Sequence, residues 1–180
     1  MLFIIALVCT ALLAGTNMLT KDRIADLAVQ TALEAKAAVM SDAASFSEEK
    51  TITVEGKDVI YYDALDGSGA TIGYVFNTVA KSYGGDVSCM VGISADTNKI
   101  TGVKITSIND TPGLGMKANS EDFLSQYIDR GGNIGVNKNT STDTEIKAIT
   151  SATITSKAVT EAVNQAFSAY ETLKAGDNNG

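Results

Sequence analysis

Histidine is absent from this chain of 180 residues, proline occurs once and cysteine twice. Without histidine there can be no His-based catalytic triad, no His-ligated metal site and no imidazole acid–base chemistry. Cys9 and Cys89 are far apart in sequence and neither has a C-x-x-C partner, so we expect no zinc or iron–sulfur centre made by this chain alone. Redox work by such a chain needs a cofactor to supply the chemistry.

Positive charge is also scarce. The chain has 14 Lys and Arg residues against 21 Asp and Glu residues, giving a formal net charge of −7. This balance argues against a nucleic-acid-binding surface, because neutralising phosphates requires clustered cations. A length of 180 residues is enough for one domain of ordinary size and an additional anchoring segment.

The N-terminal segment 2–19 carries no charge, which predicts a transmembrane anchor over residues 1–20. A cleaved signal peptide is the alternative, because small residues at Ala14, Gly15 and Thr16 could form a cleavage site. The basic segment that normally begins a signal peptide is missing, which favours a retained anchor. The positive-inside rule gives little help with orientation, since no Lys or Arg precedes the span. The two basic residues that follow it, Lys21 and Arg23, would by themselves argue against export.

Residues 21–47 are expected to form a helical stalk and a linker. The stretch 22–40 is rich in Ala, Leu, Glu and Lys and contains neither Pro nor Gly, whereas 41–47 is small and polar. A folded body is expected over 48–175 and a frayed tail over 176–180.

The body begins with patterns that are typical of strands. Segments 51–54 and 59–62 predict a hairpin, and another strand is expected through 73–76. Segments 89–93 and 96–105 predict two strands joined by a polar turn, whereas 131–140 is expected to be a loop. The aromatic residues of this region are more typical of a core or sheet face than of a ligand site; they are Tyr61, Tyr62, Tyr74 and Phe76.

A run of hydroxyl side chains, Thr150 to Lys157, lies between a short extended segment at 145–149 and a C-terminal helical pattern. The start of a helix offers unpaired N–H groups and the positive end of the macrodipole, both of which stabilise a phosphate. Lys157 would add a full positive charge. Helix capping is the alternative, because Ser and Thr are also preferred N-cap residues.

A second motif, Asn109 to Gly115, contains the single proline. Pro112 fixes its own φ, while Gly113 and Gly115 allow a sharp turn that brings bare backbone close to a flat ligand. Taken alone, the segment is more typical of an ordinary tight turn than of a cofactor loop.

Together the two motifs resemble those of the NqrC/RnfG family of FMN-binding subunits. Segment 148–159 is similar to the family's (S/T)-G-A-T site, where a flavin transferase attaches FMN through its phosphate to a threonine, here Thr153. Segment 109–115 resembles the family's E-T-P-G-L-G loop. Ser151 stands where the family usually has Gly, Asp110 where it has Glu, and Lys147 near a position that is often acidic.

A third segment, 81–87, is similar to the Gly-containing entry that precedes these strands in the family. The resemblance covers nearly the whole chain and implies an α+β fold, with curved β-sheets flanked by helices behind a single transmembrane helix. It implies FMN covalently bound to Thr153, and no metal. The surrounding cofactor-binding residues are expected to be Thr150, Ser151, Ala152, Thr155, Ser156, Lys157, Asp110, Thr111, Pro112, Gly113, Leu114, Gly115, Tyr83 and Gly84.

The function implied by this resemblance is electron relay in an Rnf-type ferredoxin:NAD oxidoreductase that moves Na⁺ or H⁺, alongside other membrane, iron–sulfur and flavin subunits. The modest length favours the Rnf branch over the sodium-pumping quinone reductase. The body is expected on the extracytoplasmic side of the cell membrane. A non-redox, membrane-tethered interaction domain is the alternative of a different class.

Overall fold

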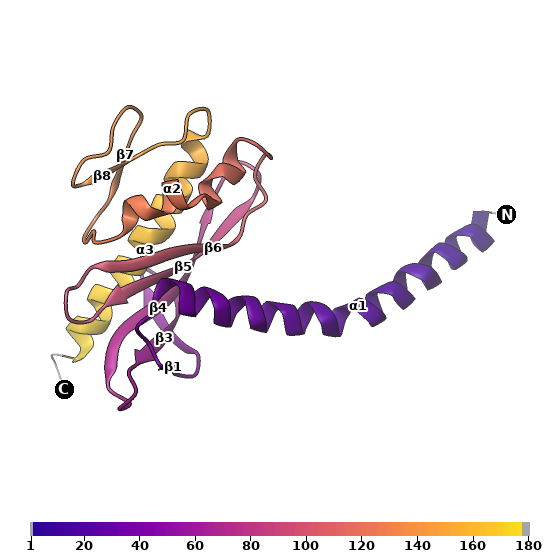
Figure 1. Cartoon of the computed structure of the whole chain (residues 1–180). Helices are drawn as coiled ribbons and strands as arrows, with labels where there is room; N and C mark the ends of the chain where they lie inside the picture. The colour runs from indigo at the N-terminus through magenta and orange to yellow at the C-terminus, as the bar shows by residue number, and fades with distance from the viewer. Residues whose placement is uncertain (1, 178–180) are drawn as a thin grey trace. The chain divides into compact units, whose positions relative to one another are not determined.

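The computed structural model describes residues 2–177, except for the side chains of residues 2, 22, 24–26, 28 and 177 (Figure 1). The chain divides into two compact units, one up to Glu34 and one from Ala35 onward. The second unit, called the body here, contains all the strands and the remaining helices. The limits that the sequence analysis set at residues 20, 47 and 175 stay predictions.

The first helix, α1 (Leu2–Val39), is continuous through the apolar N-terminal segment. Its portion Phe3–Lys21 is long and apolar enough to cross a membrane, with a mean hydropathy of 1.9. Large apolar side chains such as Phe3, Leu13 and Leu19 are exposed along it, as expected for a helix that lipid surrounds. The helix therefore has the length and composition of a membrane anchor.

The body is built on a six-stranded antiparallel sheet in the order β1-β3-β4-β5-β6, with β2 also paired to β3. Its strands are β1 (Ser45–Phe46), β2 (Lys50–Val54), β3 (Lys57–Leu65), β4 (Thr71–Lys81), β5 (Asp86–Ser94) and β6 (Ile100–Ser107). A connection of short helices follows: η1 (Gly115–Asn119), α2 (Glu121–Leu124) and η2 (Ser125–Tyr127). Two short parallel strands, β7 (Gly135–Asn137) and β8 (Glu145–Lys147), then lead into α3 (Thr153–Asp177).

Helix α3 covers one face of the sheet. Small apolar residues recur along it at helical spacing and are fully or almost fully buried: Ala158, Val159, Ala162, Val163, Ala166 and Ala169. These short side chains let the helix lie close to β4 and β5, where Phe76, Cys89, Val91 and Ile93 complete the core. The main hydrophobic core therefore lies between α3 and the sheet, and it fixes the position of α3 against β4 and β5.

The opposite face of the sheet is covered in part by the last turn of α1. Thr101 donates a hydrogen bond to the Val39 carbonyl (2.6 Å), and a side chain at Gly102 would lie 2.8 Å from the Val39 Cα. The Lys36 ammonium lies 3.2 Å from the centre of the Tyr62 ring, a cation–π contact. Burial in this contact lowers the pKa of Lys36, although the nearby Glu49 carboxylate opposes the shift. The end of α1 is thus part of the body.

The structure confirms the predicted hairpin, the strands through 73–76, 89–93 and 100–105, and the C-terminal helix. The prediction of a loop over 131–140 was wrong in part, because 135–137 form β7 beside β8. Within the expected linker, Ser45–Phe46 pair with β3, and Ser47 donates its N–H to the Asp63 carbonyl (2.9 Å). Helix α3 continues through Asp177, into the expected tail, and residues 178–180 lie outside the described residues.

The close contact between Val39 and β5 generates a stability prediction. A methyl group added at Gly92 would overlap the Val39 carbonyl oxygen, which is backbone and cannot move aside alone. We expect Gly92→Ala to lower the free energy of unfolding by about 1–3 kcal/mol, measured by urea denaturation of the full chain in detergent with circular dichroism. Gly67→Ala is the matched control, because nothing lies within 4 Å of that position. Equal urea midpoints for Gly92→Ala and Gly67→Ala would contradict the close packing of Val39 on Gly92.

Candidate functional site

The buried carboxylate of Asp110 joins three segments that are far apart in the sequence. It accepts hydrogen bonds from the Ser82 hydroxyl (2.5 Å), the Gly84 N–H (2.5 Å) and the Thr155 hydroxyl (2.6 Å). Ser82 and Gly84 belong to the turn between β4 and β5, and Thr155 lies in the first turn of α3. One side chain thus holds together all three motifs that the sequence analysis singled out.

The hydrogen bonds also determine the charge state of Asp110. Burial alone would raise the pKa of this carboxyl group, but the three donors Ser82, Thr155 and Gly84 outweigh it and hold the pKa below its ordinary value of 3.8. Asp110 is therefore ionised at neutral pH. A neutral carboxyl could not accept all three bonds as effectively, so this carboxylate is a structural anion of the site.

The loop that follows Asp110 packs tightly against the start of α3. A side chain at Gly115 would lie 2.5 Å from the Asp110 Cβ and 2.8 Å from the Thr155 hydroxyl oxygen. Gly113 adopts a φ of +77°, so glycine is needed at this turn for conformational reasons as well. The loop can approach α3 because these two positions carry no side chain.

Helix α3 starts without a side-chain cap. Its first helical hydrogen bond is donated by Ser156 to the Ala152 carbonyl (3.0 Å), so the N–H groups of Thr153, Ile154 and Thr155 have no helical acceptor. Ala152, at the N-cap position, has no polar side chain that could accept from them. These N–H groups and the positive end of the helix macrodipole form an environment that favours an anion.

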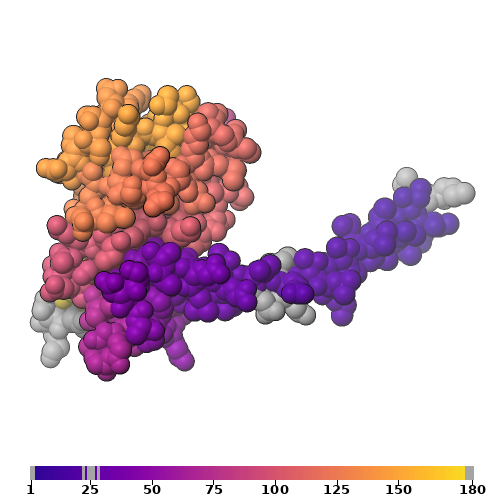
Figure 2. Space-filling model, in the orientation of Figure 1, coloured from indigo at the N-terminus to yellow at the C-terminus, as the bar shows by residue number. Residues whose placement is uncertain are grey.

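A groove of about 480 Å³ lies over this helix start. It is lined by Tyr83, Asp110, Thr111, Leu114, Gly115, Ser151, Ala152, Thr153, Ile154 and Thr155. Figure 2 shows the segment after β6 and the yellow-orange start of α3 next to each other at the surface of the body. Three apolar side chains, Tyr83, Leu114 and Ile154, stay largely exposed at the groove. The groove thus combines N–H groups that favour an anion with exposed apolar side chains.

The hydroxyls of the Thr150–Ser156 run have different environments. Thr155 is bound to Asp110, while Ser156 donates to the Ala152 carbonyl and accepts from the Ile149 N–H. Within residues 2–177, the hydroxyls of Thr150, Ser151 and Thr153 form no hydrogen bond. Of these three, Thr153 is half-buried in the groove wall as the first residue of α3, Ser151 is exposed two residues earlier, and Thr150 does not line the groove.

Several of the other expected site residues lie outside the groove lining. Gly84 supports the site through Asp110, and Pro112 and Gly113 shape the loop. Lys157 lines a second cavity, on the outer face of α3, and not the groove. The position of one amine on a helix depends on how the helix is rotated, which the hydroxyl motif does not reveal.

Two residues of the site were not found by sequence reasoning. Ser82 is a single serine before a Gly-Gly turn, and its bond to Asp110 spans 28 positions in the sequence. Ile154 sits inside the hydroxyl run, yet its side chain is 56% exposed at the groove. An apolar residue inside a polar run was the available signal for Ile154, whereas Ser82 had none.

Comparisons with known proteins match the two parts of this arrangement. A family model described as FMN-binding domain matches residues 82–168, from Ser82 through most of α3. A second model, described as RnfG N-terminal region, matches residues 1–38. The G subunit of the Na⁺-translocating ferredoxin:NAD⁺ oxidoreductase complex of Acetobacterium woodii is 36% identical, over 96% of this chain and 89% of its own length. The chain belongs to the RnfG family.

Other members of the RnfG family show similar agreement. The G subunit of the proton-translocating ferredoxin:NAD⁺ oxidoreductase complex of Clostridium ljungdahlii is 34% identical, over 92% of this chain and 85% of its own length. The G subunit of an ion-translocating oxidoreductase complex of Methanosarcina acetivorans is 31% identical, over 91% of this chain and 87% of its own length. The similarity thus extends over both the anchor and the body.

Solved structures share the fold at lower identity. The C subunit of the Na⁺-translocating NADH-quinone reductase of Parabacteroides distasonis matches 69% of this chain and 76% of its own, with a TM-score of 0.56 and 19% identity. NqrC of Shewanella oneidensis matches 76% of this chain and 73% of its own, with a TM-score of 0.54 and 20% identity. The expected α+β fold with an apolar N-terminal helix is therefore confirmed.

The ionised state of Asp110 generates a pH-dependent prediction. Because the folded pKa lies below 3.8, Asp110 stabilises the fold fully above that pH and loses its contribution as the pH falls below 3.8 through the folded pKa. We expect Asp110→Asn to lower the unfolding free energy by about 1–3 kcal/mol at pH 7. In urea titrations below pH 4, the difference in unfolding free energy between this variant and the wild type should become smaller. A difference that does not change with pH would contradict this role.

The backbone at Ser151 generates a second prediction for the site. Ser151 adopts a φ of +66°, in the left-handed region that glycine tolerates best, and the resembled motif has glycine at this position. We expect Ser151→Gly to be more stable than Ser151→Val by about 1–2 kcal/mol, measured by thermal denaturation. The same two substitutions at the exposed Ser68 serve as a reference for the difference in stability between Gly and Val at another site. Equal stability of the two Ser151 variants would show that this backbone conformation carries no cost.

Proposed function

We propose that this chain is the flavin-carrying subunit of an Rnf-type ion-translocating ferredoxin:NAD oxidoreductase, with FMN esterified through its phosphate to Thr153. The curated relatives named above are G subunits of such complexes and align with nearly the whole chain. The observation that carries the residue assignment is the environment of Thr153. Its unbonded hydroxyl lies in the groove beside N–H groups that have no helical acceptor.

The lining of the groove suits both parts of FMN, the phosphate and the flat ring. The N–H groups of Thr153, Ile154 and Thr155 would hold the phosphate, assisted by the helix macrodipole. The exposed side chains of Tyr83, Leu114 and Ile154 offer apolar surface for the flat ring. FMN supplies one-electron redox chemistry when bound, and the protein supplies its position and surroundings.

The remaining site residues position this groove. Asp110 holds the turn before β5, the loop Thr111–Gly115 and the first turn of α3 in fixed positions relative to one another. Thr155 and Ser156 use their hydroxyls for structural hydrogen bonds, which leaves Thr153 as the half-buried hydroxyl open to a transferase. Covalent attachment through the phosphate end would retain the cofactor while the ring end stays accessible to electron partners.

In this proposal α1 anchors the chain in the cell membrane and the body lies on the extracytoplasmic side, where a flavin transferase modifies it. Other membrane, iron–sulfur and flavin subunits of the complex deliver and accept the electrons. The Na⁺-translocating NADH-quinone reductase is the alternative complex, because a solved structure that shares this fold is its C subunit. The identities of 31–36% to G subunits favour the Rnf-type complex.

The covalent site generates a direct prediction. When the chain is co-expressed with a flavin transferase, we expect flavin fluorescence on a denaturing gel, and we expect Thr153→Val to abolish it because the acceptor oxygen is gone. Mass spectrometry of the peptide containing Thr153 should show the added mass of FMN less water.

Two matched controls accompany this experiment. Thr150→Val removes a neighbouring hydroxyl that does not line the groove, and Ser151→Ala removes one that does; both should keep their fluorescence. Fluorescence that persists in Thr153→Val, or added mass on Ser151, would overturn the assignment. Loss of fluorescence in all three variants would point to a folding defect, which circular dichroism would detect.

A further inference from the structure

The outer edge of the main sheet is formed by β1 and β2, both of which pair with β3. In the described part of the chain, no strand pairs with the other side of β2. The pairing of β2 with β3 has no register shift, whereas the β3–β4 and β5–β6 pairings do. Natural sheets usually protect such an edge with a bulge, a proline, charged side chains or a covering segment. Strand β2 contains neither a bulge nor a proline, and its one charged residue, Lys50, is paired with Asp63.

The register shows which backbone groups face outward. Glu55 and Gly56, with φ values of +52° and +79°, form a two-residue turn, so Val54 and Lys57 are the hydrogen-bonded pair that closes the hairpin. Bonded and non-bonded pairs alternate along an antiparallel ladder, which makes Thr51 and Thr53 non-bonded with β3. The N–H and C=O groups of these two exposed threonines therefore point away from the sheet.

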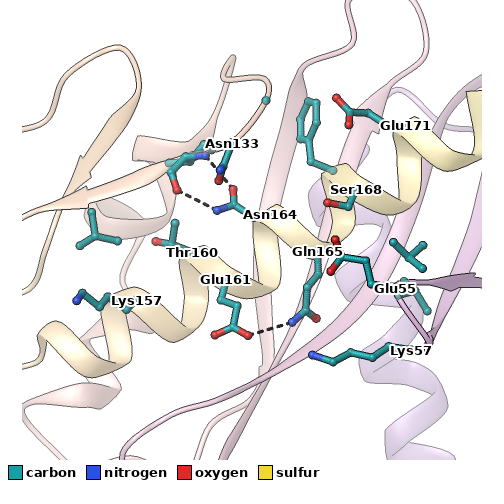
Figure 3. Close-up of a pocket in the computed structure, with 16 residues that line it drawn as sticks. Glu55, Lys57, Asn133, Lys157, Thr160, Glu161, Asn164, Gln165, Ser168 and Glu171 are labelled. Carbon is teal, nitrogen blue, oxygen red and sulfur yellow. Dashed lines mark hydrogen bonds between the residues drawn. The ribbon is translucent and has the colours of Figure 1, made fainter.

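A cavity of about 590 Å³ adjoins the tip of this hairpin, separate from the flavin groove. Its apolar surface comes from Val54, Val59, Ile134, Val136 and Phe167. Figure 3 shows Glu55 and Lys57 of the hairpin on one side, Asn133 on the other, and α3 crossing between them. The cavity is thus flanked by β2 and β7, with the outer face of α3 as its floor.

We propose that this edge and cavity bind an extended segment of another subunit of the same complex, which adds a strand to β2. This inference rests on the proposed function for the existence of that complex. Outward-facing N–H and C=O groups specify a backbone in the β conformation, because only an extended chain presents donors and acceptors at matching intervals. The apolar side chains of the cavity would receive alternate apolar residues of the added strand.

Several polar side chains at the cavity form hydrogen bonds within this chain. Asn164 uses its amide to bind both the N–H and the C=O of Ile134 (2.9 Å each), which fixes the segment before β7. Glu161 accepts from Gln165 along the outer face of α3. In the described chain Lys57 and Lys157, which also line the cavity, form no ion pair. These hydrogen bonds hold the polar side chains around the cavity in place without a partner.

The test compares Thr53→Pro with Thr53→Ala in the intact complex purified from its native membrane. Proline removes an N–H that β3 does not use, whereas alanine keeps it. We expect Thr53→Ala to co-purify like wild type, and Thr53→Pro to be retained about tenfold less, as expected when one bond of about 1.4 kcal/mol is lost. Both variants should carry flavin on Thr153, which reports correct folding.

A photo-crosslinking measurement keeps the proposal falsifiable if Thr53→Pro misfolds. We expect Thr53→p-benzoylphenylalanine to crosslink to one identified subunit of the purified complex, and the same substitution at Asp96, an exposed turn residue between β5 and β6, not to yield that product. No crosslink, or a crosslink only to a second copy of this chain, would overturn the inference while leaving the flavin site intact. If the flavinylated chain co-purified with no other subunit, both the inference and the proposed complex would fail.

Discussion

The carboxylate of Asp110 is the constraint on which the groove over the start of α3 depends. It is buried, ionised and bound by three donors from two other segments, so its desolvation is balanced only when all three segments are in place. A buried anion left without these donors would be costly. The turn before β5, the glycine loop and the first turn of α3 therefore form one structural unit around a single charge.

The start of α3 shows how packing and chemistry are combined. The small buried residues from Ala158 onward hold the helix against the sheet, while its first turn keeps N–H groups without helical acceptors. Leaving these donors unsatisfied has a cost that a capping side chain would normally remove. The sequence instead places Ala152 at the cap and a free hydroxyl at Thr153, an arrangement that suits a bound phosphate better than an empty helix end.

The two faces of the sheet have different partners. Helix α3 covers one face and forms the main core with it. The other face is covered in part by the end of α1, where Val39 lies against Gly92 and Gly102, and by Met40, which lies against Gly73. Because residues 35–47 are tied to the body by packing and by hydrogen bonds to β3 and β6, the small and polar composition of 41–47 did not produce a free linker. Tertiary contacts decided the conformation of that segment.

The sequence by itself determined the order of the elements, the apolar helix and the two motifs, because these depend on local periodicity, on glycine and proline, and on runs of hydroxyls. It also pointed to the family through residues that lie close together in the chain. Only the tertiary structure decided which hydroxyls of the 150–156 run are already hydrogen-bonded, that Lys157 lines the second cavity and not the groove, and that Ser82 joins Asp110. These outcomes depend on helix rotation and on contacts across 28 or 45 positions, which no local pattern encodes.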